Sequence, residues 1–121
     1  RDRAGECIED AMNLTDLMRR HQVDLYLSGH HHAWYPGELK GQRMLSLGAM
    51  GNGPRRLLGT QRTSDPSLTV LDLSQTTRVV RETTFSLKTL ESISLDSLPK
   101  QLSAHSFPTL NRRDTHWSYG A

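Results

Sequence analysis

The chain has 121 residues, which leaves little room for more than one domain. Its 15 Lys and Arg residues stand against 13 Asp and Glu, and a formal net charge of +2 is too balanced for the basic surface of a nucleic-acid-binding protein. The single cysteine excludes an intrachain disulfide, and no apolar run approaches the roughly 18 residues of a membrane-spanning helix.

The first predicted element is an amphipathic helix between Glu6 and His21. Apolar residues recur there at steps of three and four, with acidic residues in the first turn and basic residues in the last. The apolar run from Val23 to Leu27 follows closely and predicts a buried strand. A helix joined to a strand by such a short connection is typical of a layered α/β domain, so α/β is the fold class that we predict.

Two further stretches predict β structure. A second strand is expected from Met44 to Leu47, closed by the glycine-rich loop 48–54. Alternation from Leu68 to Leu73 and the β-branched run from Val79 to Phe85, separated by turn residues, predict a β-hairpin. After residue 86 the pattern fades, and we expect residues 87–121 to form a weakly patterned, partly irregular tail.

Three consecutive histidines, His30, His31 and His32, follow the first predicted strand. Ligand-binding groups of α/β sheets gather at the carboxyl ends of strands. Side chains two positions apart in extended backbone point to the same side, so we expect His30 and His32 to converge while His31 points away. Neutral imidazole is a common ligand of zinc, iron and related ions. The alternative for any His-x-His pattern is a solvated loop whose rings make local hydrogen bonds.

The segment from Tyr26 to Tyr35 resembles the last signature block, Gly-His-x-His, of the calcineurin-like metallophosphoesterases. The similarity is greatest to the purple acid phosphatase-like branch, although this chain has Trp34, Tyr35 and Pro36 where that branch has an aromatic residue, Glu and Arg. The resemblance implies that residues 1–86 are the C-terminal part of a layered α/β metallophosphoesterase sandwich. Its order would be helix, strand, metal loop, strand, β-hairpin and irregular tail.

The same resemblance implies a metal site. It makes His30 a ligand of one metal ion and His32 a ligand of the other ion in a binuclear centre, with iron, zinc, manganese or another divalent metal as cofactor. His31 would fill the variable position. Two such ions clamp a phosphoryl group, so the implied activity of the full-length protein is phosphoric ester hydrolysis by a phosphatase or phosphodiesterase. The resemblance implies no catalytic residue separate from these ligands, and it leaves the phosphate ester substrate open.

The other signature blocks of this family do not precede the Gly-His-x-His block in this chain. There is no Gly-Asp-x-x-Asp or Gly-Asn-His block, and Asn52 between Gly51 and Gly53 does not make the last of these. The one Asp-x-His string, at residues 114–116, comes after the Gly-His-x-His block. Residue 1 is Arg rather than Met, so we expect a fragment whose missing N-terminal part carries those blocks. Two imidazoles give each metal one ligand, short of the roughly four that a catalytic site assembles. The 121-residue chain alone is therefore predicted to be inactive.

Two alternatives stay open at this point. The chain can be a non-catalytic, truncated domain that binds a metal or a partner through its hairpin. It can also be a different metalloenzyme that uses the His-x-His pattern on a strand, in which case His105 or Glu82 would have to supply the third ligand. If the purified chain folds without metal and shows no phosphatase activity after metal is added, the first alternative survives and activity of the chain itself is excluded.

Other candidate residues have simpler structural explanations. Trp34 and Tyr35 could flank a leaving group beside a metal, but we expect them to cover the edge of the core. The arginine doublets at positions 55–56 and 112–113 could contact phosphate, but we expect these side chains to be solvated.

Overall fold

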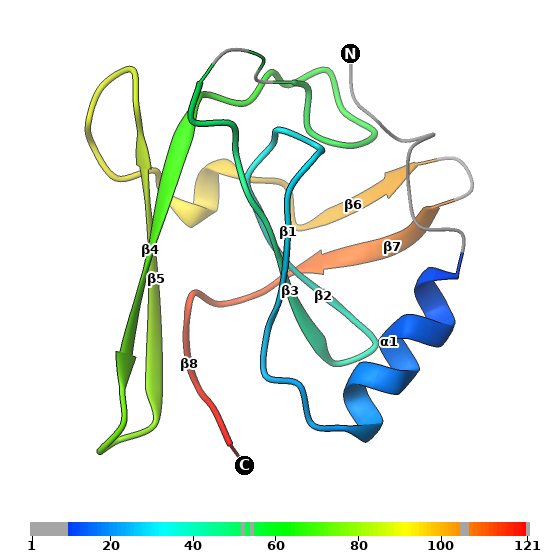
Figure 1. Ribbon diagram of the computed structural model, residues 1–121. Coiled ribbons are helices and arrows are strands. Elements are labelled where there is room, and N and C mark those ends of the chain that lie inside the picture. Colours follow the sequence, from blue (N-terminus) through cyan, green and yellow to red (C-terminus); the bar gives the residue numbers. More distant parts are fainter. Residues whose placement is uncertain (1–9, 52, 54, 105–106, 121) are drawn as a thin grey trace.

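The computed structural model describes residues 10–51, 53, 55–104 and 107–120 (Figure 1). Among these residues the strands form two sheets, one of five strands in the order β1-β3-β2-β7-β6 and one of three in the order β4-β5-β8. The elements in chain order are α1 (Ala11–Arg20), β1 (Tyr26–Ser28), β2 (Tyr35–Leu39), β3 (Gln42–Ser46), β4 (Ser67–Ser74), β5 (Val79–Ser86), the 3-10 helix η1 (Leu95–Ser97), β6 (Gln101–Ala104), β7 (Phe107–Arg112) and β8 (His116–Ser118).

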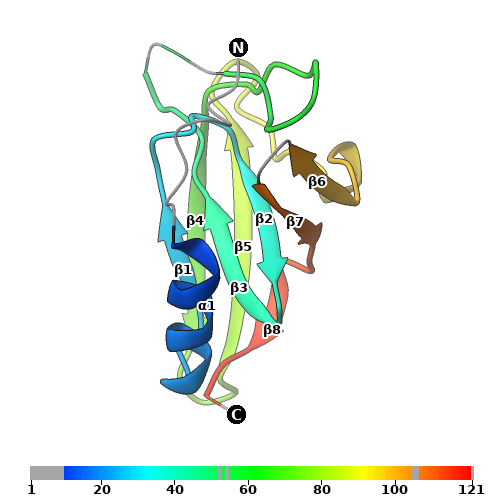
Figure 2. The same cartoon turned by 90° about the vertical axis from the view of Figure 1, so that its right-hand side faces the viewer.

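The protein is mostly β, and the α/β sandwich predicted from the sequence is wrong. In the residues described, one α-helix of 10 residues and one 3-10 turn accompany eight strands in two sheets. Two views agree that α1 lies on one side of the five-stranded sheet and the β4–β5 hairpin on the other (Figures 1 and 2). The prediction failed because β2, β6, β7 and β8 were not foreseen, and these strands make the sheets dominate the structure.

Helix α1 ends as the sequence predicts, with two basic residues in its last turn. Part of its predicted first turn, residues 6–9, lies outside the described residues. The chain leaves the helix through Gln22, which has a left-handed φ of 55°. The Gln22 N–H donates to the carbonyl of Arg19 at 3.1 Å, and the Val23 N–H donates to that of Met18 at 3.0 Å. These two bonds form a Schellman motif that satisfies the last helical carbonyls and directs the chain toward β1.

The predicted strand at Val23–Leu27 is present but short and displaced. It is observed as β1, which is parallel to β3 with Tyr26 opposite Met44 and Ser28 opposite Ser46. The prediction that this strand is buried is wrong, because β1 is an edge strand and the side chain of Leu27 is 49% exposed. The second predicted strand is confirmed as β3, which begins two residues earlier than expected.

Strand β2 was not predicted because it contains Pro36 and Gly37, two residues that normally argue against a strand interior. The carbonyl of Pro36 nevertheless accepts a hydrogen bond of 3.2 Å from the N–H of Arg113, and Gly37 pairs with β7. Lys40 and Gly41 connect β2 to β3 with φ angles of 51° and 84°. Two successive left-handed residues match the twist of a tight hairpin, so this turn fixes the antiparallel pairing of β2 with β3.

The predicted hairpin is confirmed as β4 and β5, which pair antiparallel from Ser67 opposite Ser86 to Ser74 opposite Val79. The prediction of an irregular tail is wrong. Residues after 86 contain η1 and the strands β6, β7 and β8, of which β7 pairs with β2 and β8 pairs with β5. A division of the chain at residue 86 stays a prediction, and two strand pairs, β2 with β7 and β5 with β8, connect the two sides of that point.

The hydrophobic core combines residues of β2, β3 and β6 with residues of the connecting loops. Trp34 is 5% and Tyr35 2% exposed, which confirms that both aromatic residues belong to the core. The buried cluster consists of Ala33, Trp34, Tyr35, Leu45, Leu57, Leu58, Leu98 and Leu102.

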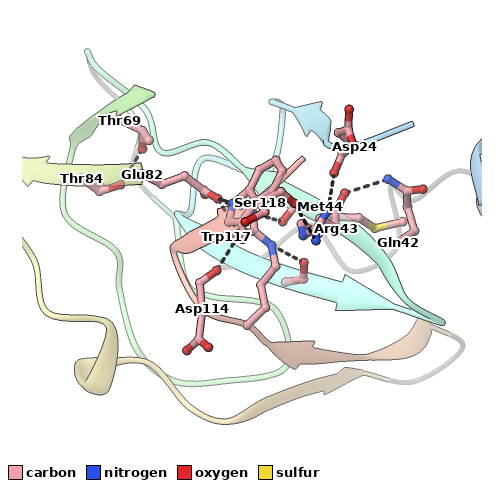
Figure 3. Close-up of polar contacts among 12 residues, drawn as sticks. Asp24, Gln42, Arg43, Met44, Thr69, Glu82, Thr84, Asp114, Trp117 and Ser118 are labelled. Atoms are coloured by element: carbon pink, nitrogen blue, oxygen red, sulfur yellow. Dashed lines mark hydrogen bonds and ion pairs between the residues drawn. The ribbon is translucent and has the colours of Figure 1, made fainter. Parts of the chain in front are cut away.

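A buried ion pair joins the two sheets, and we call Glu82, Arg113 and Trp117 the inter-sheet latch. The Arg113 guanidinium donates to both carboxylate oxygens of Glu82 on β5, with Nη2 at 3.1 Å from Oε1, and the Trp117 indole N–H donates to the same carboxylate (Figure 3). Arg113 also donates to the carbonyls of Gly37 at 2.8 Å and Met44 at 3.0 Å. One side chain therefore holds β2 and β3 of the first sheet against β5 of the second. The expectation that Arg113 is solvated is wrong.

Burial raises the pKa of the Tyr35 hydroxyl from 10.0 to about 12, and the positive charge of Arg112 partly opposes this shift. The hydroxyl donates a hydrogen bond of 3.0 Å to the carbonyl of Pro99. An ionised oxygen there would lose this bond and its contact with water. The folded protein therefore keeps the phenolic proton at a pH where the unfolded chain releases it.

We expect the free energy of unfolding to fall by roughly 2 kcal/mol between about pH 10 and about pH 12, because the unfolded state binds fewer protons there. Below pH 10 both states hold the proton of Tyr35, and this contribution is fully present. Urea unfolding at about pH 9 and about pH 11.5 measures the fall. Tyr35→Phe is the control and should lose less stability across the same interval. An equal loss in both proteins would contradict this assignment.

Candidate functional site

The three histidines lie in the turn between β1 and β2. Because β1 and β3 are parallel, their carboxyl ends lie at the same edge of the sheet. The Leu47 N–H donates to the carbonyl of Ser28 at 2.8 Å and joins the two strand ends. The glycine-rich loop that follows β3 therefore starts beside the histidine turn, at the top of the view in Figure 1. Two segments that the sequence analysis treated separately form one site.

Two of the histidines have unusual backbone conformations. His30 has a φ of 73° and His32 a φ of 56°, both in the left-handed region that residues with a side chain seldom adopt. The N–H of His31 between them donates to the carbonyl of Gly29 at 2.9 Å, which makes a tight turn. Backbone strain of this kind costs about 1 to 3 kcal/mol per residue and concentrates at functional sites. Four other residues with a side chain have a left-handed φ in the described part of the chain, so this conformation defines a tight turn and does not by itself distinguish a functional turn from a simple connection.

The glycine-rich loop holds His32. The ring Nδ1 lies 2.6 Å from the carbonyl oxygen of Gly53, and the His32 carbonyl accepts a hydrogen bond of 3.1 Å from the N–H of Arg55. A carbonyl can only accept, so Nδ1 carries the proton and the neutral ring has its lone pair on Nε2. Metal-ligating histidines commonly donate their second ring N–H to a backbone carbonyl. His32 therefore fits a metal ligand that binds through Nε2.

Sequence analysis identified loop 48–54 as a turn but missed Gly53 as the partner of His32. Gly53 has a φ of 104°, and a Cβ on this residue would lie 3.3 Å from Nδ1 of His32. Glycine is therefore required both by the backbone conformation and by the ring beside it. The parallel pairing of β1 with β3 would have revealed this contact, because β1 leads into the histidines and β3 leads into the loop. That arrangement depends on β2, which was not predicted.

The other two rings lie against each other. The centroids of His30 and His31 are 5.9 Å apart, with the ring planes at 79°. His30 is exposed, whereas His31 is half-buried and lines an apolar cavity of about 140 Å³ with residues of α1 and β1. The ring of His31 therefore contacts that of His30, and the left-handed backbone at His30 and His32 differs from the extended backbone on which the expected alternation of the side chains rested. The convergence of His30 with His32 stays a prediction.

The other residues that the sequence offered as candidates for the site either make structural contacts or lie outside the part of the chain that the structure describes. The carboxylate of Glu82 is bound in the inter-sheet latch, which argues against a role as third metal ligand. Arg112 donates to the carbonyls of Leu95 and Leu98. Arg56 donates to the side chain of Gln61 at 2.7 Å. His105, Asn52 and residues 1–9 lie outside the described residues.

The described residues contain neither a cluster of metal-binding side chains nor a membrane-spanning helix. No group of three or more His, Cys, Asp or Glu side chains is placed there so that it could hold a metal ion. The helices that the structure describes are too short and too polar to cross a membrane.

Comparisons with models of protein families, with curated proteins and with solved structures gave no match for this chain.

Proposed function

We propose that His30 and His32 are metal ligands of a metallophosphoesterase, and that a longer protein containing this chain hydrolyses phosphoric esters at a binuclear metal centre. The observation that carries this proposal is the hydrogen bond between Nδ1 of His32 and the carbonyl of Gly53, because it prepares Nε2 for a metal. The class of reaction rests on the Gly-His-x-His resemblance.

In this proposal each histidine has one role. His30 would bind one ion and His32 the other, while Gly53 fixes the tautomer of His32 and Arg55 fixes its backbone. The remaining ligands would have to come from residues outside these 121. When bound, the metal ions would act as Lewis acids that polarise the phosphoryl group. The 121-residue chain itself contributes ligand positioning, and we expect no hydrolysis from it alone.

We expect His30→Ala and His32→Ala each to lower the hydrolysis of p-nitrophenyl phosphate by the longer protein more than about 100-fold, because removing a ligand costs more than removing its outer partner. Gly53→Ala should lower metal affinity and activity by about 10-fold to 100-fold, since it displaces the carbonyl that orients His32. Steady-state kinetics and metal content per protein molecule measure both effects. His31→Ala is the matched control and should stay close to the unchanged protein.

Several outcomes would contradict the proposal. Unchanged turnover in either the His30 or the His32 variant would remove that residue from the metal site. A loss as large in His31→Ala would show that the pattern has been assigned in the wrong register. Metal binding by the longer protein without hydrolysis of any phosphoric ester would favour a non-catalytic metal-binding module.

A further inference from the structure

The apolar cavity of about 140 Å³ between α1 and the five-stranded sheet has no part in the proposed metal site, and we call it the α1 cavity. The sheet contributes Leu39, Met44 and Leu102 to its walls, and α1 contributes Leu14 and Met18. Among the described residues, no Asp, Glu, Lys or Arg lines it. The cavity therefore offers an uncharged and mostly apolar surface to a ligand.

Much of the cavity wall belongs to the buried core. Leu57, Leu58 and Leu102 are members of the core cluster, and Thr15 and Met18 are the buried residues of α1. Protein interiors seldom contain voids larger than a water molecule, because the atoms around an empty void lose packing contacts and the fold loses stability. A void of this size in the core therefore indicates an occupant that restores those contacts.

The hydroxyl groups deepest in the wall are already bonded to the protein. The Thr15 hydroxyl donates to the carbonyl of Ala11 at 2.7 Å. The Ser46 hydroxyl donates to the carbonyl of Ala33 at 2.8 Å, and the Tyr35 hydroxyl is bonded to a backbone carbonyl as well. A buried water needs about two to four polar partners, so this part of the cavity suits an apolar molecule better than water.

The side chains of the wall favour an aromatic ring over other apolar groups. Two tyrosines, Tyr26 and Tyr35, and two methionines, Met18 and Met44, line the cavity. Aromatic rings attract each other in edge-to-face contacts, and methionine sulfur makes favourable contacts with ring edges. The ring of His31 adds a further aromatic group where β1 leads into the histidine turn.

We propose that the α1 cavity binds a neutral aromatic molecule of about the size of benzene. An apolar cavity of roughly 150 Å³ stays dry and holds one benzene molecule, and the α1 cavity has nearly this volume. The ring packs between Leu14 and Met18 of the helix and Met44 of the sheet. This site is separate from the proposed ligands His30 and His32. It would stand if the proposed phosphoesterase function failed, and the reverse is also true.

Nuclear magnetic resonance of the 121-residue chain, isotope-labelled at the methionine methyl groups, provides the test, because the sequence has only four methionines. Met18 and Met44 line the cavity, whereas Met50 is 64% exposed and serves as the internal control. Each signal is assigned by its loss when that methionine is replaced by leucine. Benzene is the probe. We expect it to shift the Met18 and Met44 signals saturably and leave the Met50 signal unchanged, with a dissociation constant on the order of millimolar.

Two leucines of α1 give matched variants. Leu14→Trp should weaken benzene binding by about 10-fold or more, because the larger side chain takes up part of the cavity. Leu17→Trp, at a position that is 45% exposed, should leave binding unchanged. Cyclohexane has as many carbon atoms as benzene but no aromatic ring, and it should bind more weakly than benzene.

Four results would overturn the proposal. They are unshifted Met18 and Met44 signals, an equal shift of the Met50 signal, unchanged benzene binding by Leu14→Trp, and cyclohexane binding as tight as that of benzene. Should Leu14→Trp fail to fold, Ala11→Phe, which also adds volume to the wall, replaces it with the same expected direction.

Discussion

Arg113→Met is expected to destabilise the protein by about 3 to 5 kcal/mol, because it leaves the buried carboxylate of Glu82 without its cation. The two side chains are 5% and 1% exposed, so water cannot replace the lost partner. The carbonyls of Gly37 and Met44 also lose a donor in this variant. Urea unfolding at neutral pH measures the change in the free energy of unfolding. Such a loss is a large share of the roughly 5 to 15 kcal/mol that stabilises a typical domain.

Two further variants separate loss of the ion pair from general damage. Arg81→Met removes an exposed arginine next to Glu82 on β5 and should change stability by less than about 0.5 kcal/mol. The double variant Glu82→Leu with Arg113→Met removes both charges and should recover part of the stability, because it avoids the uncompensated buried charge. The Trp117 N–H and the carbonyls of Gly37 and Met44 still lack their partners in it, so the recovery should be incomplete. A double variant no more stable than Arg113→Met alone would contradict the explanation, as would a loss in Arg81→Met of the same size.

The second large effect is expected for Leu45→Ala, which should lower the free energy of unfolding by about 2 to 5 kcal/mol. Leu45 on β3 is 0% exposed and belongs to the buried cluster of the core. Its truncation removes apolar contacts and leaves a cavity that the surrounding strands can only partly fill. Chemical unfolding measures this loss as a shift of the denaturation midpoint.

Leu27 offers a closely matched control. It is the partner of Leu45 across the parallel β1–β3 pair, yet its side chain is 49% exposed. Leu27→Ala should therefore cost less than about 1 kcal/mol, because little apolar surface leaves contact with the protein. A similar loss in both variants would mean that the outer face of β1 is buried in solution, for example by another molecule.

The fold was predictable where a local pattern decided it. The β4–β5 hairpin follows from alternation and β-branched residues, and β3 follows from a short apolar run before glycines. Strand β2 could not be found this way, because Tyr35 and Leu39 enclose Pro36 and Gly37, and the pairing of β2 depends on β3 and β7 rather than on its own residues. The prediction that β1 is buried failed for the same reason. The place of β1 at the edge of the sheet depends on pairing between distant strands and not on its own residues.

For the site, too, local patterns could be predicted from the sequence and contacts between distant residues could not. The His-x-His pattern and the glycine-rich loop are visible in the sequence, and the expectation that Trp34 and Tyr35 belong to the core is confirmed. The bond between His32 and Gly53 spans 21 residues and exists only because β1 and β3 are parallel. Arg113 was expected to be solvated, because it is charged and its segment has no hydrophobic periodicity. It is buried instead, because its hydrogen-bond partners come from three distant strands.

The inter-sheet latch also sets an order of events during protein synthesis. Glu82 and Arg113 are 31 residues apart in sequence. At about 5 to 20 residues per second, a ribosome needs roughly 2 to 6 s to make the intervening chain. During that interval the β4–β5 hairpin can form locally, but Glu82 has no arginine to receive it and must keep contact with water. We therefore expect the two sheets to pack together only after Arg113 has left the ribosome, because earlier closure would bury the carboxylate of Glu82 without its cation.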